Sequence, residues 1–180
     1  MNSSRAFVVN FGSLPAGEHE FEFHVGDTFF QQFENSIIEN GDVDVLVVLE
    51  KKEHLLLIDF TMQGTITLPC DRCLEDIELE LESHNELIVK QGADKDETSE
   101  DVIVISPREY ELDLAPFIYE YLTVSLPLRV VHEDEEGRPA CDPEILKELE
   151  KHLSHSDSEE KEDEPATDPR WDILKNINLN

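Results

Sequence analysis

Apolar positions in the first half of the chain alternate with polar ones, which is typical of β-strands with one buried face. Three apolar residues alternate with glutamate and histidine over residues 20–25, and the period of two returns over 43–49 and 55–68. The polar segment 51–54 separates the last two runs, so we expect a hairpin there. Residues 77–82 set aliphatic side chains against a row of glutamates. This pattern predicts a sheet that is covered on one side only.

A spacing of three to four residues replaces the alternation in two places, where it predicts helices. The first is a short helix over residues 29–37, after a turn at 26–28. The second lies in residues 114–122, where Asp113 can cap the first turn. Pro116 stands in that first turn, where its missing N–H costs little.

Beyond His132 the composition changes. Acidic residues far outnumber basic ones between 133 and 164, and aliphatic residues are few outside one short helix. Asp142 and Pro143 mark the start of that helix. Its apolar side is formed by Ile145, Leu146, Leu149 and Leu153. Residues 155–164 have the composition of a disordered charged linker.

The C-terminal residues predict one more capped helix. Asp168 and Pro169 open it, and Trp171, Leu174 and Ile177 lie along one side. The chain has one tryptophan, and it lies in this segment. A large exposed aromatic side chain marks a contact surface. The helix therefore either folds back onto the domain or docks a partner, and both alternatives stay open.

Together these elements predict an α+β fold. We expect a mostly antiparallel, curved sheet with a few packed helices, followed by an acidic, partly disordered C-terminal tail. The pattern leaves open whether the sheet closes into a barrel. We expect an α+β domain over residues 1–132, an acidic segment with one short helix over 133–167, and a C-terminal helix over 168–180.

Charge is the unusual feature of the composition. The 180 residues include 43 acidic and 14 basic ones, for a formal net charge of −29. Such a field repels phosphate backbones and anionic lipids and attracts basic proteins at long range. We therefore favour a basic protein as partner over direct contact with RNA, and we expect no contact with a membrane. The plain alternative is that the acidity only keeps the chain in solution.

The N-terminal residues and the cysteine count indicate a compartment. No signal-peptide core follows the first residues, and no apolar stretch is long enough to span a bilayer. The three cysteines form an odd set that suits a secreted disulfide framework poorly. We expect a cytoplasmic protein.

The segment Cys70-Asp71-Arg72-Cys73 is the sharpest local motif. Two cysteines with this spacing can bind one tetrahedral zinc ion, because a tight turn brings both sulfurs to one side. His132 and Cys141 are the candidates for the other two ligands. A set of three cysteines and one histidine would form a closed structural zinc site that ties the C-terminal segment to the sheet.

Two other interpretations of the motif compete with zinc. A thioredoxin-like redox pair needs its first cysteine at the start of a helix, where the dipole lowers the thiol pKa. The residues after Cys73 alternate like a strand, which disfavours redox catalysis. The remaining alternative is two ordinary small residues in a turn. No nucleotide-binding, nucleophile-elbow or HExxH motif is present, so we expect no catalytic site.

Three segments resemble a known family. Residues 68–74, Leu-Pro-Cys-Asp-Arg-Cys-Leu, are similar to the CxRC signature of the YceD family, the large ribosomal RNA subunit accumulation proteins. Residues 112–116, with Glu120 and the Leu-Pro pair at 126–127, are similar to its central "IDLxPxIxExxLLxLP" stretch. Residues 168–174 are similar to its terminal DPRWxxL motif. The order and spacing agree over roughly residues 60 to 177.

The resemblance implies a non-catalytic factor that bacteria need for normal accumulation of 23S ribosomal RNA. Many members carry further cysteines after the Leu-Pro pair, in a pattern like C-x-G-x-C-x-x-C. In this chain His132 stands where the first of them would fall, Cys141 follows Gly137, and the others are missing. The departure suggests that not every member must bind zinc.

We therefore predict a factor for 23S accumulation and large-subunit assembly that binds a basic ribosomal protein or an rRNA maturation factor. The acidic strand face would steer the encounter. The residues expected to dock the partner are Asp168, Pro169, Arg170, Trp171 and Leu174. The alternative is a general acidic protein-binding module without a ribosomal role, which predicts broad, salt-sensitive binding to cationic proteins.

Overall fold

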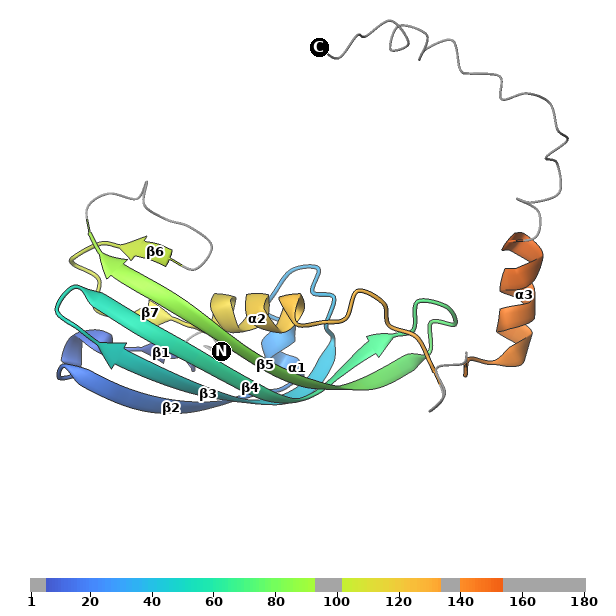
Figure 1. The fold of residues 1–180 in the computed structure, drawn as a ribbon, viewed down its shortest axis with the longest axis horizontal. Helices are drawn as coiled ribbons and strands as arrows, with labels where there is room; N and C mark the ends of the chain where they lie inside the picture. The colour runs from blue at the N-terminus through green and yellow to red at the C-terminus, as the bar shows by residue number, and fades with distance from the viewer. Residues whose placement is uncertain (1–5, 93–101, 134–139, 154–180) are drawn as a thin grey trace, which may run out of the picture.

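A twisted sheet forms the body of the protein (Figure 1). The computed structural model describes residues 6–92, 102–133 and 140–153, and within them this sheet has five strands. In spatial order they are β2 (Gly17–Val25), β3 (Asn40–Lys51), β4 (Leu55–Pro69), β5 (Asp76–Gln91) and β6 (Val102–Ile105). A second, two-stranded sheet pairs β1 (Val8–Val9) with β7 (Leu112–Asp113), and a 3₁₀ turn (Phe11–Ser13) follows β1.

The strands from β2 to β5 pair antiparallel with their neighbours in sequence. The predicted hairpin is confirmed, because β3 and β4 join through a short reversal at residues 52–54. The residues expected to follow as strand continue β4 without a break as far as Pro69. β6 was not predicted, and it pairs parallel to β5. The sheet is therefore mostly antiparallel, as expected.

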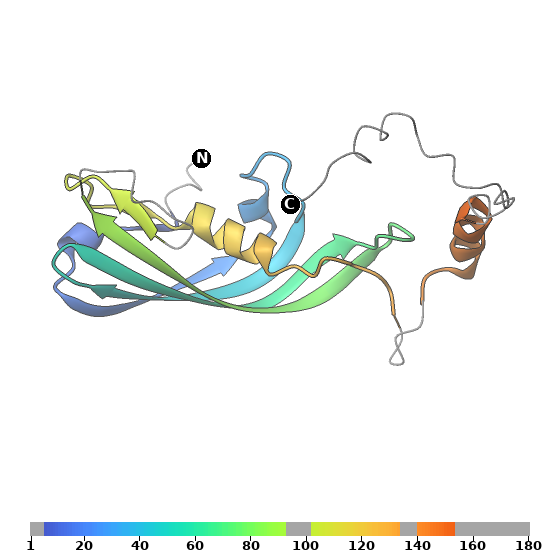
Figure 2. The same ribbon diagram turned by 45° about the horizontal axis from the view of Figure 1, so that its top comes forward.

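The sheet does not close into a barrel. Its end strands are β2 and β6, and neither pairs with a further strand in the described part of the chain. The helices α1 (Asp27–Phe30) and α2 (Ala115–Val124) both lie on the same side of the sheet (Figure 2). No described helix or strand covers the opposite side, which confirms a sheet covered on one side only.

The covered face carries the hydrophobic core. Alternate side chains of β3 and β4 point into it and are almost fully buried: Val43, Val45, Val47, Leu49, Leu56, Ile58, Phe60 and Met62. Helix α2 closes the layer with Ile118 and Leu122, which have no exposed surface. Each fully buried aliphatic or aromatic side chain of this size contributes about 1.5–3 kcal/mol. The period-two pattern thus sets which face of the sheet is buried.

The first predicted helix is much shorter than its spacing indicated. Helix α1 ends at Phe30, and the next residues form turns with bonds from Gln32 N–H to the Phe29 carbonyl and from Phe33 N–H to the Phe30 carbonyl. Asn35 has a φ of 58°, a left-handed conformation that no continuing helix allows. Phe33 instead stacks on Tyr119 of α2, with ring centroids 4.0 Å apart. Packing against α2 therefore explains the apolar spacing of this segment.

The other two helices follow their predicted limits closely. Asp113 lies in β7, and its Oδ1 accepts a hydrogen bond from Ala115 N–H, so it satisfies the first turn of α2 while Leu114 is the capping position. Helix α3 (Pro143–Leu153) begins where Asp142 and Pro143 predicted. Asp142 Oδ1 accepts a hydrogen bond from Glu144 N–H at 2.7 Å. The predicted C-terminal helix at 168–180 lies outside the described residues.

Candidate metal centre

The Cys-x-x-Cys motif occupies the turn between β4 and β5. Cys70 N–H donates to the Glu75 carbonyl at 2.8 Å, and Leu74 N–H donates to the Cys70 carbonyl at 3.0 Å. Leu74 has a φ of 62°, and this left-handed residue bends the chain back into β5. A leucine in that conformation costs roughly 1–2 kcal/mol. The turn brings the sulfurs of Cys70 and Cys73 to one side, as a zinc knuckle requires.

A distant segment, residues 129–133, reaches the turn through two bonds to one residue. Asp71 N–H donates to the Val130 carbonyl at 2.7 Å, and Val130 N–H donates to Asp71 Oδ2 at 2.7 Å. The reciprocal pair fixes the register of the segment beside the motif. It thereby brings His132 next to Cys73, whose sulfur lies 3.3 Å from His132 Nδ1.

The fourth residue of the group, Cys141, lies just before helix α3. Ala140 N–H donates to the His132 carbonyl at 3.0 Å, which holds the start of this segment beside the turn. Cys141 follows, and its sulfur lies 3.7 Å from that of Cys70. Ile145 and Leu146 of α3 pack against the cysteines.

The four side chains form one compact group of three sulfurs and one imidazole nitrogen. Their ligand atoms all lie within 4.8 Å of one another, and the sulfur of Cys141 lies 4.0 Å from His132 Nδ1. Around one tetrahedral zinc ion, with bonds of about 2.3 Å to sulfur and 2.0 Å to nitrogen, two sulfurs lie about 3.8 Å apart and sulfur and nitrogen about 3.5 Å apart. The distances of 3.7, 3.3 and 4.0 Å fit such an ion. The residues present therefore match a structural zinc site.

The turn also sets the charge of the thiols. Burial raises the pKa of the Cys70 thiol, but the backbone N–H groups of Cys73, Arg72 and His132 outweigh it and lower that pKa to about 5. Arg72 N–H, for example, lies 3.4 Å from the Cys70 sulfur. Burial, together with the neighbouring sulfurs of Cys70 and Cys141, raises the pKa of the Cys73 thiol to about 11. Thiolate and imidazole are the donors that zinc prefers.

The geometry argues against the redox interpretation of the motif. The turn leads into β5, so the cysteines do not open a helix. The low pKa of the Cys70 thiol comes mainly from backbone N–H groups of the turn and of His132, which equally suit a metal-bound thiolate. Reactive cysteines are partly exposed, whereas the Cys70 side chain has no exposed surface.

The sequence analysis named all four of these residues as candidate metal ligands, and the fold brings their side chains together. The sequence alone did not indicate that Asp71 would bind the segment 129–133, because this role depends on Val130, far along the chain. A second group, Asp59, His84 and Glu86, also lies within 4.8 Å on the outer side of β4 and β5. This group could not be found from the sequence, because only the pairing register of β4 and β5 brings its residues together. The residues expected to dock a partner, from Asp168 to Leu174, lie outside the described part of the structure.

Among the described residues, no helix is long and apolar enough to cross a membrane.

The fold and this site together define a class: a small α+β protein in which a thiol and imidazole corner closes one end of an open sheet. Residues 58–178 match the model of a family described as "Large ribosomal RNA subunit accumulation protein YceD". The chain belongs to the YceD family, which confirms the resemblance found in its motifs.

A relative in Bacillus subtilis (strain 168) is "Uncharacterized protein YlbN". It is 25% identical over 138 residues, which cover 76% of this chain and 78% of that protein. No solved structure matches the chain.

Proposed function

We propose that this protein is a non-catalytic cytoplasmic factor that supports 23S ribosomal RNA accumulation and assembly of the large ribosomal subunit. The observation that carries the proposal is the family match over residues 58–178 and the description of that family. The match includes all four residues of the candidate metal centre, so the site lies within the region that defines the family.

The metal centre serves structure in this proposal. Four protein ligands complete the tetrahedron of a zinc ion and leave no position open for water or substrate, which is typical of structural sites. Bound at this position, zinc would join the β4–β5 turn to the segment 129–133 and to helix α3. The residues that would hold it are Cys70, Cys73, His132 and Cys141.

The direct partner in this proposal is a basic ribosomal protein or an rRNA maturation factor. The net charge of −29 supports it, because the protein attracts cationic surfaces and repels bare RNA. We further propose that the tail residues Asp168, Pro169, Arg170, Trp171 and Leu174 dock the partner. The corresponding division of the chain is a domain over 1–132, an acidic segment over 133–167 and the docking helix over 168–180.

Depletion of the protein in its own host tests the proposed function. We expect a selective fall in the ratio of 23S to 16S ribosomal RNA and a loss of large subunits in a sucrose gradient. Re-expression of the wild-type protein should restore both. An unchanged ratio would contradict the ribosomal role and favour the alternative, an acidic module that binds cationic proteins in general.

Native mass spectrometry of the full chain tests the metal site separately. We expect one zinc ion per chain in the wild-type protein and none after His132→Asn. The control is His54→Asn, which changes an exposed histidine in the β3–β4 reversal and should leave the zinc content unchanged. A wild-type chain purified with zinc present but carrying none would disprove the zinc site.

A further inference from the structure

No described helix or strand covers the outer face of the sheet. Helices α1 and α2 lie on the other side of the sheet (Figure 2). The alternating burial along β2 to β5 places every second side chain of these strands on the outer side. Strand register aligns them in rows that cross the sheet. One row runs through Glu20, Val48, Asp59 and Glu86, and the next through Glu22, Leu46, Thr61 and His84.

Acidic side chains occur on all four of these strands and are most frequent on β2 and β5. The carboxylates on the outer face are Glu18, Glu20, Glu22, Asp42, Asp44, Glu50, Asp59, Asp76, Glu78, Glu80, Glu82 and Glu86. The lysine on the same face of these four strands is Lys90, near the end of β5. Like charges placed side by side across a sheet destabilise it. The fold therefore concentrates negative charge on this face at a cost to its own stability.

A narrow apolar strip runs diagonally from β3 to β5 among these carboxylates. Leu46, at the centre of β3, is 37% exposed. Val48 follows in the next row of β3, and Leu57 of β4 and Ile88 of β5 lie one row further along the same face; all three are half-buried. Neighbouring strands are about 4.8 Å apart, so Glu20 of β2 and Glu86 of β5 stand roughly 14 Å apart, with Val48 of β3 and Asp59 of β4 between them.

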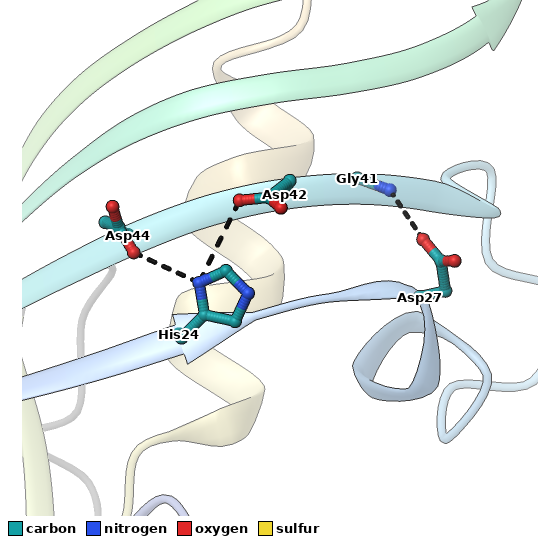
Figure 3. A network of polar contacts seen from close by, with 5 residues as sticks. All are labelled: His24, Asp27, Gly41, Asp42 and Asp44. Carbon is teal, nitrogen blue, oxygen red and sulfur yellow. Dashed lines mark hydrogen bonds and ion pairs between the residues drawn. The ribbon is translucent and has the colours of Figure 1, made fainter.

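Basic side chains of the protein itself already pair with carboxylates of this face, as Lys52 Nζ does with Glu50 Oε2 at 2.9 Å. His24 of β2 points toward β3, with its Nδ1 3.0 Å from Asp44 Oδ1 and 3.9 Å from Asp42 Oδ1 (Figure 3). These two carboxylates raise the pKa of His24, first through the hydrogen bond to Asp44 and then through the charge of Asp42. The face thus stabilises a positive charge placed on it.

We infer that the outer face of β2 to β5 is the docking surface for a segment of a basic protein. This occupant places apolar side chains on Leu46 and Val48, and lysine or arginine side chains on Glu20 and Glu22 at one flank and on Asp59 and Glu86 at the other. That this partner is a ribosomal protein rests on the proposed function. Its basic and apolar character is inferred from the surface alone. Nucleic acid and a second copy of this acidic chain are repelled by the same charges.

A photo-crosslinking amino acid in place of Leu46 tests the docking surface in the host. We expect crosslinks to a strongly basic protein from position 46, and none from the matched exposed positions Val124 and Leu128. Crosslinks from position 46 to RNA or to a second copy of the chain, or no crosslink at all, would overturn the inference.

Charge neutralisation then separates the local surface from net charge. The test variant combines Glu20→Gln, Glu22→Gln, Asp59→Asn and Glu86→Gln. The control removes the same number of charges elsewhere, with Glu34→Gln, Glu39→Gln, Glu109→Gln and Glu111→Gln, all at exposed positions. We expect the test variant to bind a lysine-rich peptide with a central leucine stripe about tenfold more weakly or worse, and the control to change binding less than threefold.

Chemical-shift mapping with the same peptide locates its binding site on the full chain. We expect perturbed amides along β2 to β5. If the test variant and the control variant bind the peptide equally weakly, net charge alone attracts it, and the inference is overturned. The depletion experiment tests the ribosomal role separately from the docking surface. A normal 23S to 16S ratio with a basic protein crosslinked at Leu46 would remove the ribosomal role and keep the docking surface.

Discussion

Two regions of the molecule are held together by different means: the body, formed by β2 to β6, α1 and α2, and the corner, formed by the 70–75 turn, residues 129–133 and α3. In the body, strands β3 and β4 and helix α2 bury a continuous set of large side chains, among them Phe60, Leu49 and Ile118, with almost no exposed surface. At the corner the buried residues are three cysteines. The aliphatic side chains packed on them, Ile77, Val131, Ile145 and Leu146, are only half-buried.

The difference indicates which part can stand alone. A core of this size offsets the conformational entropy of the strands by burial of apolar surface. The aliphatic side chains of the corner are few, so we expect the order of the segment 129–133 and of α3 to depend on a bound zinc ion. We therefore expect the body to fold without metal and the corner to require it.

The largest effect should come from the body. Phe60→Ala removes a fully buried ring that packs edge-on against Tyr121, with centroids 5.3 Å apart. We expect a loss of about 3–5 kcal/mol of unfolding free energy, measured by urea denaturation. The neighbouring exposed residue provides the control, because Thr61→Ala should change that free energy by less than about 0.5 kcal/mol. Similar values for both variants would show that the sheet is not the stable part.

Substitution of one candidate metal ligand, or removal of the metal, should destabilise only the corner. Cys73→Ser, or a strong chelator, should abolish hydrogen-exchange protection in α3 while the amides of β3 and β4 keep theirs. The opening free energy of α3 should fall to near zero, and the main unfolding transition should stay in place. Loss of protection across the whole sheet would mean that body and corner fold as one unit.

A smaller effect is expected from the residue that joins the two segments of the corner. Asp71→Ala removes the carboxylate that accepts from Val130 N–H, so His132 is positioned less firmly. Residues that orient metal ligands without binding the metal change affinity by roughly 10–100-fold. We expect about a tenfold lower zinc affinity in a chelator competition. Glu78→Ala, an exposed change in β5, should leave the affinity unaltered.

The smallest effect concerns the surface of the body. Because Asp44 and Asp42 raise the pKa of His24, protonated His24 stabilises the fold. That contribution is fully present below the usual histidine pKa of about 6.5 and is lost as the pH rises through the raised value. NMR titration should show the His24 pKa above 6.5 and show it falling in Asp44→Asn. The side chain is exposed, so the unfolding free energy should hardly change. A pKa that is the same in both proteins would refute the pairing.

The sequence by itself determined the local features of this protein. Alternation over β2 to β5 predicted the strands and their buried face, because successive side chains of a strand point to opposite sides. Asp142 and Pro143 predicted the start of α3, since capping depends on neighbours in sequence. The motif from Cys70 to Cys73 indicated a metal knuckle for the same reason.

Only the tertiary structure decided what depends on distant partners. It ended α1 at Phe30 and stacked Phe33 on α2, and it added β6 as a parallel strand. It showed that Asp71 joins Val130, and it assembled the carboxylates of separate strands into one face around Leu46. Each of these outcomes depends on strand register and on contacts across long stretches of chain, and a local pattern carries no information about which distant residues meet.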